Sequence, residues 1–308
     1  MIAYIFPGQG SQGAGMGRAL HERSAIARDV FGVVDEALGF SLTDIMFGDD
    51  AAALTPTEIQ QPAIFAHSVA AFAALRKRHE SGPAMVAGHS LGEYSALLAA
   101  GCIDLATAAR LVRTRGEMMA RAGEQVGGAM AAAIGMERDQ VARLVQDASA
   151  EGEIVVANYN CPGQIVISGT AEAVAAARRI GRERGARIVP LKVSGAFHSP
   201  LMAPVVEQLK PHIAGARIVD ATVPLVSNVD ATPRTDAEGI SCALVAQITG
   251  SVLWEDSVRR MIAEGVDTFV ELGPGTVLSK MIPRIDDGVT TYSVDDLDRL
   301  QAVLDVLG

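Results

Sequence analysis

Short apolar segments alternate with segments of helical spacing along most of the chain. Residues 2–6, 84–87 and 268–272 are short and apolar and stand beside glycine or proline, which is typical of buried strands. Residues 25–38 place apolar side chains three and four positions apart, which is typical of a helix that packs along one face. This alternation predicts an α/β fold with a mainly parallel sheet.

The middle of the chain has a different order of elements. Its predicted strands and helices are, in chain order, 129–135 (strand), 138–148 (helix), 154–159 and 164–168 (strands), 172–184 (helix) and 187–193 (strand). The order β-α-β-β-α-β is that of the ferredoxin-like unit. We therefore expect a ferredoxin-like subdomain at residues 127–194, inserted between the two halves, 1–126 and 195–308, of a larger catalytic subdomain.

Further elements are expected outside this insert. Helices are predicted at residues 62–75, 90–100, 105–122 and 200–214. Residues 222–228 are expected to be extended, and residues 241–265 mostly helical.

Charge and hydropathy exclude several classes of protein. The 308 residues include 36 acidic and 26 basic ones, a net charge of −10, whereas nucleic-acid binders and polybasic membrane anchors need a basic surface. No apolar run reaches 18 residues, so no membrane span is expected. Cys102, Cys161 and Cys242 are too few and too widely spaced for a metal cluster or a disulfide framework, which favours the reducing cytoplasm.

A serine lies between two glycines where a predicted strand meets a predicted helix. The segment Gly-His-Ser-Leu-Gly at residues 88–92 follows the apolar run 84–87, as a nucleophile elbow requires. Such a turn pushes Ser90 Oγ out of the backbone, and the N–H groups of the helix favour negative charge that develops there. The alternative is a serine that only caps the helix.

His198 is the preferred base among six histidines. It follows a predicted strand and precedes a helix that begins with proline, at the sheet edge where α/β sites are built. His21 and His79 lie among charged residues and are expected to be solvated, and His89 is expected to point away from Ser90 Oγ. No acidic residue lies near His198, so a backbone carbonyl could hold its Nδ1–H.

Arg115 is the one charged residue on an otherwise apolar helix face. In the predicted helix 105–122 it shares a stripe with Leu111, Val112, Met118, Met119 and Ala122. A buried guanidinium without a partner is very costly, and no carboxylate lies three or four positions away. Its partner is therefore a carboxylate from a distant segment, in a structural ion pair, or the carboxylate of a ligand held by two hydrogen bonds.

Five blocks in order along the chain resemble malonyl-CoA:acyl-carrier-protein transacylases. They are residues 6–12 (FPGQGSQ), 88–97 (GHSLGEYSAL), 195–199 (GAFHS), 227–230 (SNVD) and 271–275 (ELGPG). The resemblance implies an α/β-hydrolase-like core with a ferredoxin-like insert, malonyl-CoA as substrate, an acyl carrier protein as partner and no permanently bound cofactor or metal. We expect a monomer.

The resemblance also implies the catalytic roles. Ser90 would be the acylated nucleophile and His198 its base, with Gln247 orienting His198 through a main-chain carbonyl. The N–H groups of Gln9 and Leu91 would form the oxyanion hole, although the glycine-rich loop that carries Gln9 could also be a simple turn.

The implied substrate-binding residues surround this centre. Arg115 would bind the free carboxylate of malonyl, and Phe197 resembles the malonyl-selective pattern rather than that of enzymes for branched malonyl groups. Met119, Asn158 and Asn160 complete the set. One departure is Ser251, which replaces a proline common in the family and is expected to affect only a loop.

Other readings stay open at this level. A free-standing acyltransferase of a polyketide synthase would use the same chemistry with a different carrier protein. A serine hydrolase would need an acid, for which Asp104 and Asp287 are available. A catalytically silent module that binds an acidic carrier protein would need a basic patch, and the candidates, which could equally form a solvated face, are Arg178, Arg179, Arg182, Arg184, Arg187 and Lys192.

Overall fold

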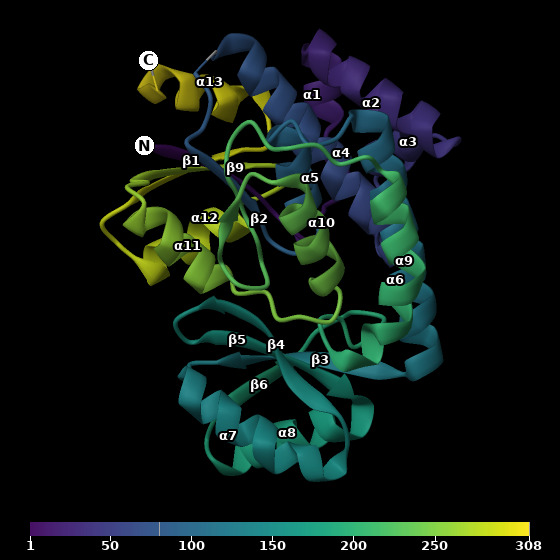
Figure 1. The fold of residues 1–308 in the computed structure, drawn as a ribbon, viewed down its shortest axis with the longest axis vertical. Coiled ribbons are helices and arrows are strands. Elements are labelled where there is room, and N and C mark those ends of the chain that lie inside the picture. The colour runs from purple at the N-terminus through teal and green to yellow at the C-terminus, as the bar shows by residue number, and fades with distance from the viewer. Residues whose placement is uncertain (80, 308) are drawn as a thin grey trace.

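The computed structural model describes residues 1–79 and 81–307, which form two parts, one above the other in Figure 1. The larger part holds a six-stranded sheet in the order β10-β9-β1-β2-β7-β8, parallel except between β7 and β8. Its strands are β1 (Ile2–Phe6), β2 (Met85–Gly88), β7 (Leu225–Val226), β8 (Pro233–Arg234), β9 (Thr268–Leu272) and β10 (Thr290–Val294).

Both faces of this sheet are covered, because its central strands are apolar on both sides. In β1, Tyr4 and Phe6 join one hydrophobic cluster and Ala3 and Ile5 another. On the second face lie α11 (Trp254–Ala263) and α12 (Val277–Ile285). The first cluster takes in α1 (Arg18–Arg23), α2 (Ala25–Leu38), α3 (Leu42–Phe47), α4 (Thr57–Arg78), α5 (Gly92–Ala99), α6 (Leu105–Val126), α9 (Ala203–Gly215), α10 (Ala237–Ala246) and α13 (Leu297–Leu307).

The smaller part is a four-stranded antiparallel sheet in the order β4-β5-β3-β6, which is the ferredoxin-like order. Helices α7 and α8, at the bottom of Figure 1, pack on one face of this sheet. Together with the sheet they enclose a third hydrophobic cluster. Its elements are β3 (Gly128–Ile134), α7 (Arg138–Ala148), β4 (Ile154–Cys161), β5 (Gln164–Thr170), α8 (Ala171–Glu183) and β6 (Arg187–Pro190). The predicted α/β fold with a ferredoxin-like insert is therefore confirmed. Within the described residues, no helix is both long and apolar enough to cross a membrane.

Helix α4 begins at Thr57, five residues before the predicted start, and contains Pro62 in its interior. Proline has no N–H, so the carbonyl of Glu58 loses its usual helical donor. Arg113 of α6 supplies the replacement, since its Nη1 donates to Glu58 O at 2.6 Å. Gly116 lets α6 approach this closely, because a Cβ there would lie 2.9 Å from Glu58 Cα.

Residues 241–265 are mostly helical, as predicted, in α10 and α11, and the non-helical residues 247–253 separate the two helices. The chain leaves α10 at Ala246 and crosses to the insert, where it runs beside β4. Tyr159 N donates to Val252 O at 2.9 Å, and Val252 N donates to Ala157 O at 2.8 Å. These bonds to another part of the chain replace the helical ones, and they bring residues 247–250 to the edge of the sheet next to Ser90.

Candidate active site

Ser90 occupies a strained turn between β2 and α5. Its φ of 51° lies in the left-handed region, which is costly for a residue with a Cβ. A Cβ on Gly88 would lie 1.9 Å from the carbonyl carbon of Gly92, and one on Gly92 would lie 2.1 Å from Phe6 O. Both glycines are therefore required. The alternative of a capping serine is wrong, because the N-cap position is Leu91 and Ser90 Oγ points to other partners.

His198 lies within hydrogen-bonding distance of the serine. Its Nε2 is 2.7 Å from Ser90 Oγ, while its Nδ1 lies 2.9 Å from Gln247 O and 3.2 Å from Gly250 O. Two carbonyl oxygens can only accept, so they place the proton on Nδ1 and leave the lone pair of Nε2 facing the serine. Burial, and next the positive charge of Arg115, lower the pKa of His198 to about 3. At neutral pH the imidazole is thus an uncharged proton acceptor.

Arg115 lies beneath the same serine and is 1% exposed. Its Nη1 donates to Gln61 Oε1 at 2.7 Å, and its Nη2 donates to Gln247 Oε1 at 2.9 Å and to Ser90 Oγ at 3.2 Å. The guanidinium also lies 5.4 Å from the ring centre of Tyr94. All these partners are neutral, and within the described chain Arg115 forms no ion pair, so the predicted alternative of a structural ion pair is wrong.

The main chain of the elbow is held by Asn228, a residue that sequence reasoning did not single out. Ser90 N donates to Asn228 Oδ1 at 2.7 Å, and Asn228 Nδ2 donates to Gly88 O at 2.7 Å. The Ser90 amide is therefore already used. The N–H groups of Gln9 and Leu91, by contrast, donate no hydrogen bond to any residue in the described ranges. The signal for Asn228 was present in the sequence block at 227–230, which had no role assigned within it.

A pocket of about 440 Å³ opens beside Ser90 between the two parts of the molecule. Three predicted site residues, Arg115, Gln247 and Leu91, do not line it. The predicted site residues that do line it are Gln9, Ser90, Met119, Asn158, Asn160, Phe197 and His198.

His89 joins the elbow to the insert. Its Nε2 lies 2.8 Å from Asn160 Oδ1, and its ring meets the Trp254 ring edge-on at 5.8 Å, so it points away from Ser90 Oγ as expected. The expectation that His79 is solvated is wrong, because it ends α4 in a buried position where its N–H donates to the carbonyl of Leu75 at 2.8 Å.

Comparison with known proteins identifies the family of this serine–histidine–arginine site. Residues 3–296 match the family model described as "Acyl transferase domain". The chain belongs to the acyl transferase family. A relative in this family is the malonyl CoA-acyl carrier protein transacylase of Bacillus subtilis (strain 168), 44% identical over 310 residues that cover 99% of this chain and 97% of the relative. The chain is thus an acyltransferase, and an enzyme.

Solved structures of this family agree over the whole length. The acyl-carrier-protein S-malonyltransferase of Bartonella henselae is 42% identical, with a TM-score of 0.95 and coverage of 100% of this chain and 99% of that one. A malonyl-transacylase solved in complex with its type II PKS acyl-carrier protein is 35% identical, with a TM-score of 0.95 and 99% coverage of both chains.

Ser251, where the resemblance leads us to expect a proline, lies close to the catalytic base. Ser251 lies in the segment that brings the carbonyl groups of Gln247 and Gly250 to His198. Its Oγ donates to Val156 O of β4 at 2.6 Å, a bond that proline could not make. Ser251 therefore links the two parts of the molecule on the segment that orients the base.

Proposed function

We propose that the protein transfers a malonyl group from malonyl-CoA to the phosphopantetheine thiol of an acyl carrier protein, through a malonyl-serine intermediate. One observation carries the proposal: Ser90 Oγ lies between His198 Nε2 and an Arg115 that has no ion-pair partner within the described chain. The histidine suits the nucleophile, and a buried guanidinium that donates only to neutral oxygens suits an acyl group that ends in a carboxylate. The printed names of the relatives support both malonyl and the carrier protein.

The first half of the reaction uses groups already in place. As Ser90 Oγ attacks the thioester carbonyl carbon, its proton moves to His198 Nε2. The Oγ–C bond forms, and the N–H groups of Gln9 and Leu91 hold the oxyanion, each donor contributing about 3 kcal/mol. When the intermediate collapses, the C–S bond breaks, and the departing sulfur of CoA takes the proton from His198. The carrier thiol then repeats the steps in reverse order.

In this proposal the substrate-binding residues recognise both the charge and the shape of the malonyl group. In this proposal Arg115 binds its carboxylate and releases Ser90 Oγ as it does so. Phe197 and Met119 form apolar walls of the pocket, and Phe197 leaves little room for an α-methyl group. Asn158 and Asn160 add polar side chains from the insert to the lining of the pocket.

The carrier protein is proposed to approach the open edge of the pocket beside the insert. Carrier proteins are acidic, and Lys192 of the expected basic patch lines this pocket. Two other members of the patch are partly neutralised, since Arg184 pairs with Asp147 and Arg179 with Glu183. We further propose that the protein is a cytoplasmic monomer. We also propose that the insert spans residues 127–194, because all strands of the smaller sheet lie within this range.

The direct test of this function supplies malonyl-CoA and a holo acyl carrier protein to the purified enzyme. We expect malonyl transfer to the carrier to exceed release of free malonate by about tenfold or more, because the bound carboxylate fixes the acyl group for the incoming thiol. Faster malonate release would indicate a serine hydrolase, and no turnover would indicate a silent binding module. Competing carriers of fatty acid and polyketide synthesis, assayed together, would separate these two pathways.

A further inference from the structure

Glu93 places a carboxyl group beneath the serine elbow, where the reaction as described does not use it. It lies in the first turn of α5 and is 1% exposed. An acidic residue at such a position is usually exposed and stabilises the helix end. Here Oε2 instead accepts from Gln247 Nε2 at 2.6 Å and, more weakly, from Asn228 N at 3.4 Å, so the carboxyl group is part of a buried network.

Gln247 connects this carboxyl group to the reacting residues. Its Nε2 donates to Glu93 Oε2 and also to Ser90 O at 2.9 Å, which uses both of its hydrogens. Its Oε1 accepts from Arg115 Nη2 at 2.9 Å. If the carboxamide turned over, its oxygen would face the acceptor oxygens of Glu93 and Ser90, and its NH₂ would face the guanidinium. The acceptor oxygen of Glu93 therefore helps to keep Gln247 Oε1, and not Nε2, facing Arg115.

The protonation state of Glu93 does not change this arrangement. Burial raises the pKa of Glu93 to about 7, although the hydrogen bond from Gln247 opposes the shift. Oε1 has no hydrogen-bond partner within the described residues and can carry the proton, while Oε2 accepts in either state. The function of the side chain is thus to provide an acceptor at a fixed place, and a neutral carbonyl oxygen of the same reach could replace it.

We propose that Glu93 is a positioning residue: it holds the Gln247 side chain so that Oε1 stays on Arg115, and thereby it sets the preference for acyl groups that carry a carboxylate. The inference rests on the proposed function of Arg115 as the carboxylate ligand. Glu93 does not line the pocket, and Gln247 is the hydrogen-bond partner through which it reaches Arg115.

The test compares Glu93→Ala and Glu93→Gln with the unchanged enzyme, using malonyl-CoA and acetyl-CoA as donors and one carrier protein. Loss of the acceptor in Glu93→Ala is expected to lower the malonyl-to-acetyl ratio of kcat/KM by about tenfold, mainly through KM for malonyl-CoA. Glu93→Gln keeps a carbonyl acceptor and is expected to restore the ratio to within about threefold.

A matched control removes another buried carboxylate. Glu271 is fully buried and accepts from the amides of Leu278 at 3.0 Å and Ser279 at 2.8 Å at the start of α12. Glu271→Ala should lower the temperature of unfolding without changing the malonyl-to-acetyl ratio. A general loss of stability is thereby separated from a loss of positioning.

Three results would overturn the inference. One is an equal loss of malonyl and acetyl transfer in Glu93→Ala, and another is a Glu93→Gln variant as impaired as Glu93→Ala. The third is an unchanged ratio in Glu93→Ala while Arg115→Ala loses its malonyl preference. If Arg115→Ala itself keeps the preference, then the proposed function of Arg115 fails, and the inference falls with it.

Discussion

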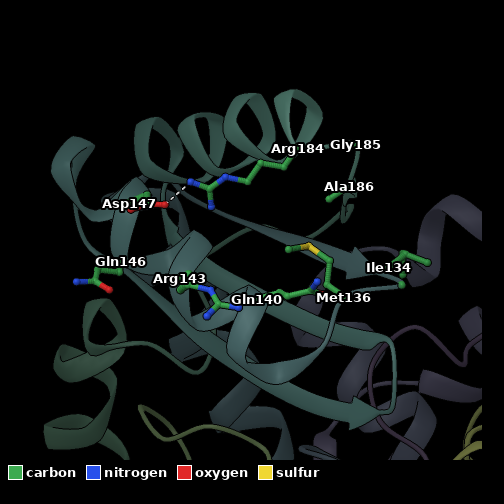
Figure 2. A pocket seen from close by; sticks show the side chains of 10 residues that line it. Ile134, Met136, Gln140, Arg143, Gln146, Asp147, Arg184, Gly185 and Ala186 are labelled. Atoms are coloured by element: carbon green, nitrogen blue, oxygen red, sulfur yellow. Dashed lines mark hydrogen bonds and ion pairs between the residues drawn. The ribbon is translucent and has the colours of Figure 1, made fainter.

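The active site and a hollow on the insert each contain an arginine, and the two arginines have opposite surroundings. In the active site, Arg115 is 1% exposed and donates only to neutral oxygens. The hollow on the insert has a volume of about 580 Å³ and lies between α7 and the end of α8 (Figure 2). There Arg184 forms an ion pair with Asp147, and the two side chains are 47% and 46% exposed. The insert hollow thus offers a charge that is hydrated and already paired, whereas Arg115 at the active site is a desolvated charge that forms no ion pair within the described chain. Only the second arrangement gives an anionic ligand a large gain in free energy.

Two glycines, one in the serine elbow and one at the insert hollow, give the largest expected difference. Gly92→Ala should lower the free energy of unfolding by about 3 kcal/mol or more, because its Cβ would meet the backbone of Phe6. Gly185, at the insert hollow, has a φ of 73°, and a Cβ there would meet nothing within 4 Å, so Gly185→Ala should cost about 1 kcal/mol from backbone strain alone. Denaturant unfolding of both variants measures this, and equal losses would show that the elbow tolerates a side chain.

The arginines give the next difference. Arg115→Ala should lower kcat/KM for enzyme acylation by malonyl-CoA about 100-fold, or about 2.7 kcal/mol, since losing one member of a buried charge pair costs about 2–5 kcal/mol. Acylation by acetyl-CoA should fall much less. Arg143, exposed on the insert hollow in Figure 2, is the control, and Arg143→Ala should change neither rate by more than about twofold. Equal effects of Arg115→Ala on both donors would contradict the carboxylate role.

Local spacing was enough to find the charged and nucleophilic residues of the site. Ser90 was visible from two glycines at a strand–helix boundary, and Arg115 from a charge on an apolar stripe. His198 was predicted from its place after a strand at 187–193, but that strand is β6 of the insert and ends at Pro190, so this signal was only approximate. The signals for Ser90 and Arg115 lie within about one helical turn of each residue, and the structure brings these two side chains together with His198.

The polar residues that hold this centre could not be found in the same way. Glu93 and Gln247 are 154 positions apart, and Ser90 and Asn228 are 138 apart. Spacing within one helix says nothing about such contacts, so Glu93 looks like an ordinary acidic residue at a helix start. The break at residues 247–253 was missed for the same reason, since its hydrogen bonds go to the insert and to His198. The polar contacts of Glu93 and Asn228 and the break at residues 247–253 all depend on hydrogen bonds between residues far apart in the sequence.

The most direct test of the account is the intact mass of the enzyme after incubation with malonyl-CoA in the absence of a carrier protein. The unchanged enzyme should gain the mass of one malonyl group, because Ser90 Oγ faces a neutral His198 that can take its proton. Ser90→Ala should gain none. Malonyl retained on Ser90→Ala, or an enzyme that turns over without ever carrying the group, would contradict the proposed malonyl-serine intermediate.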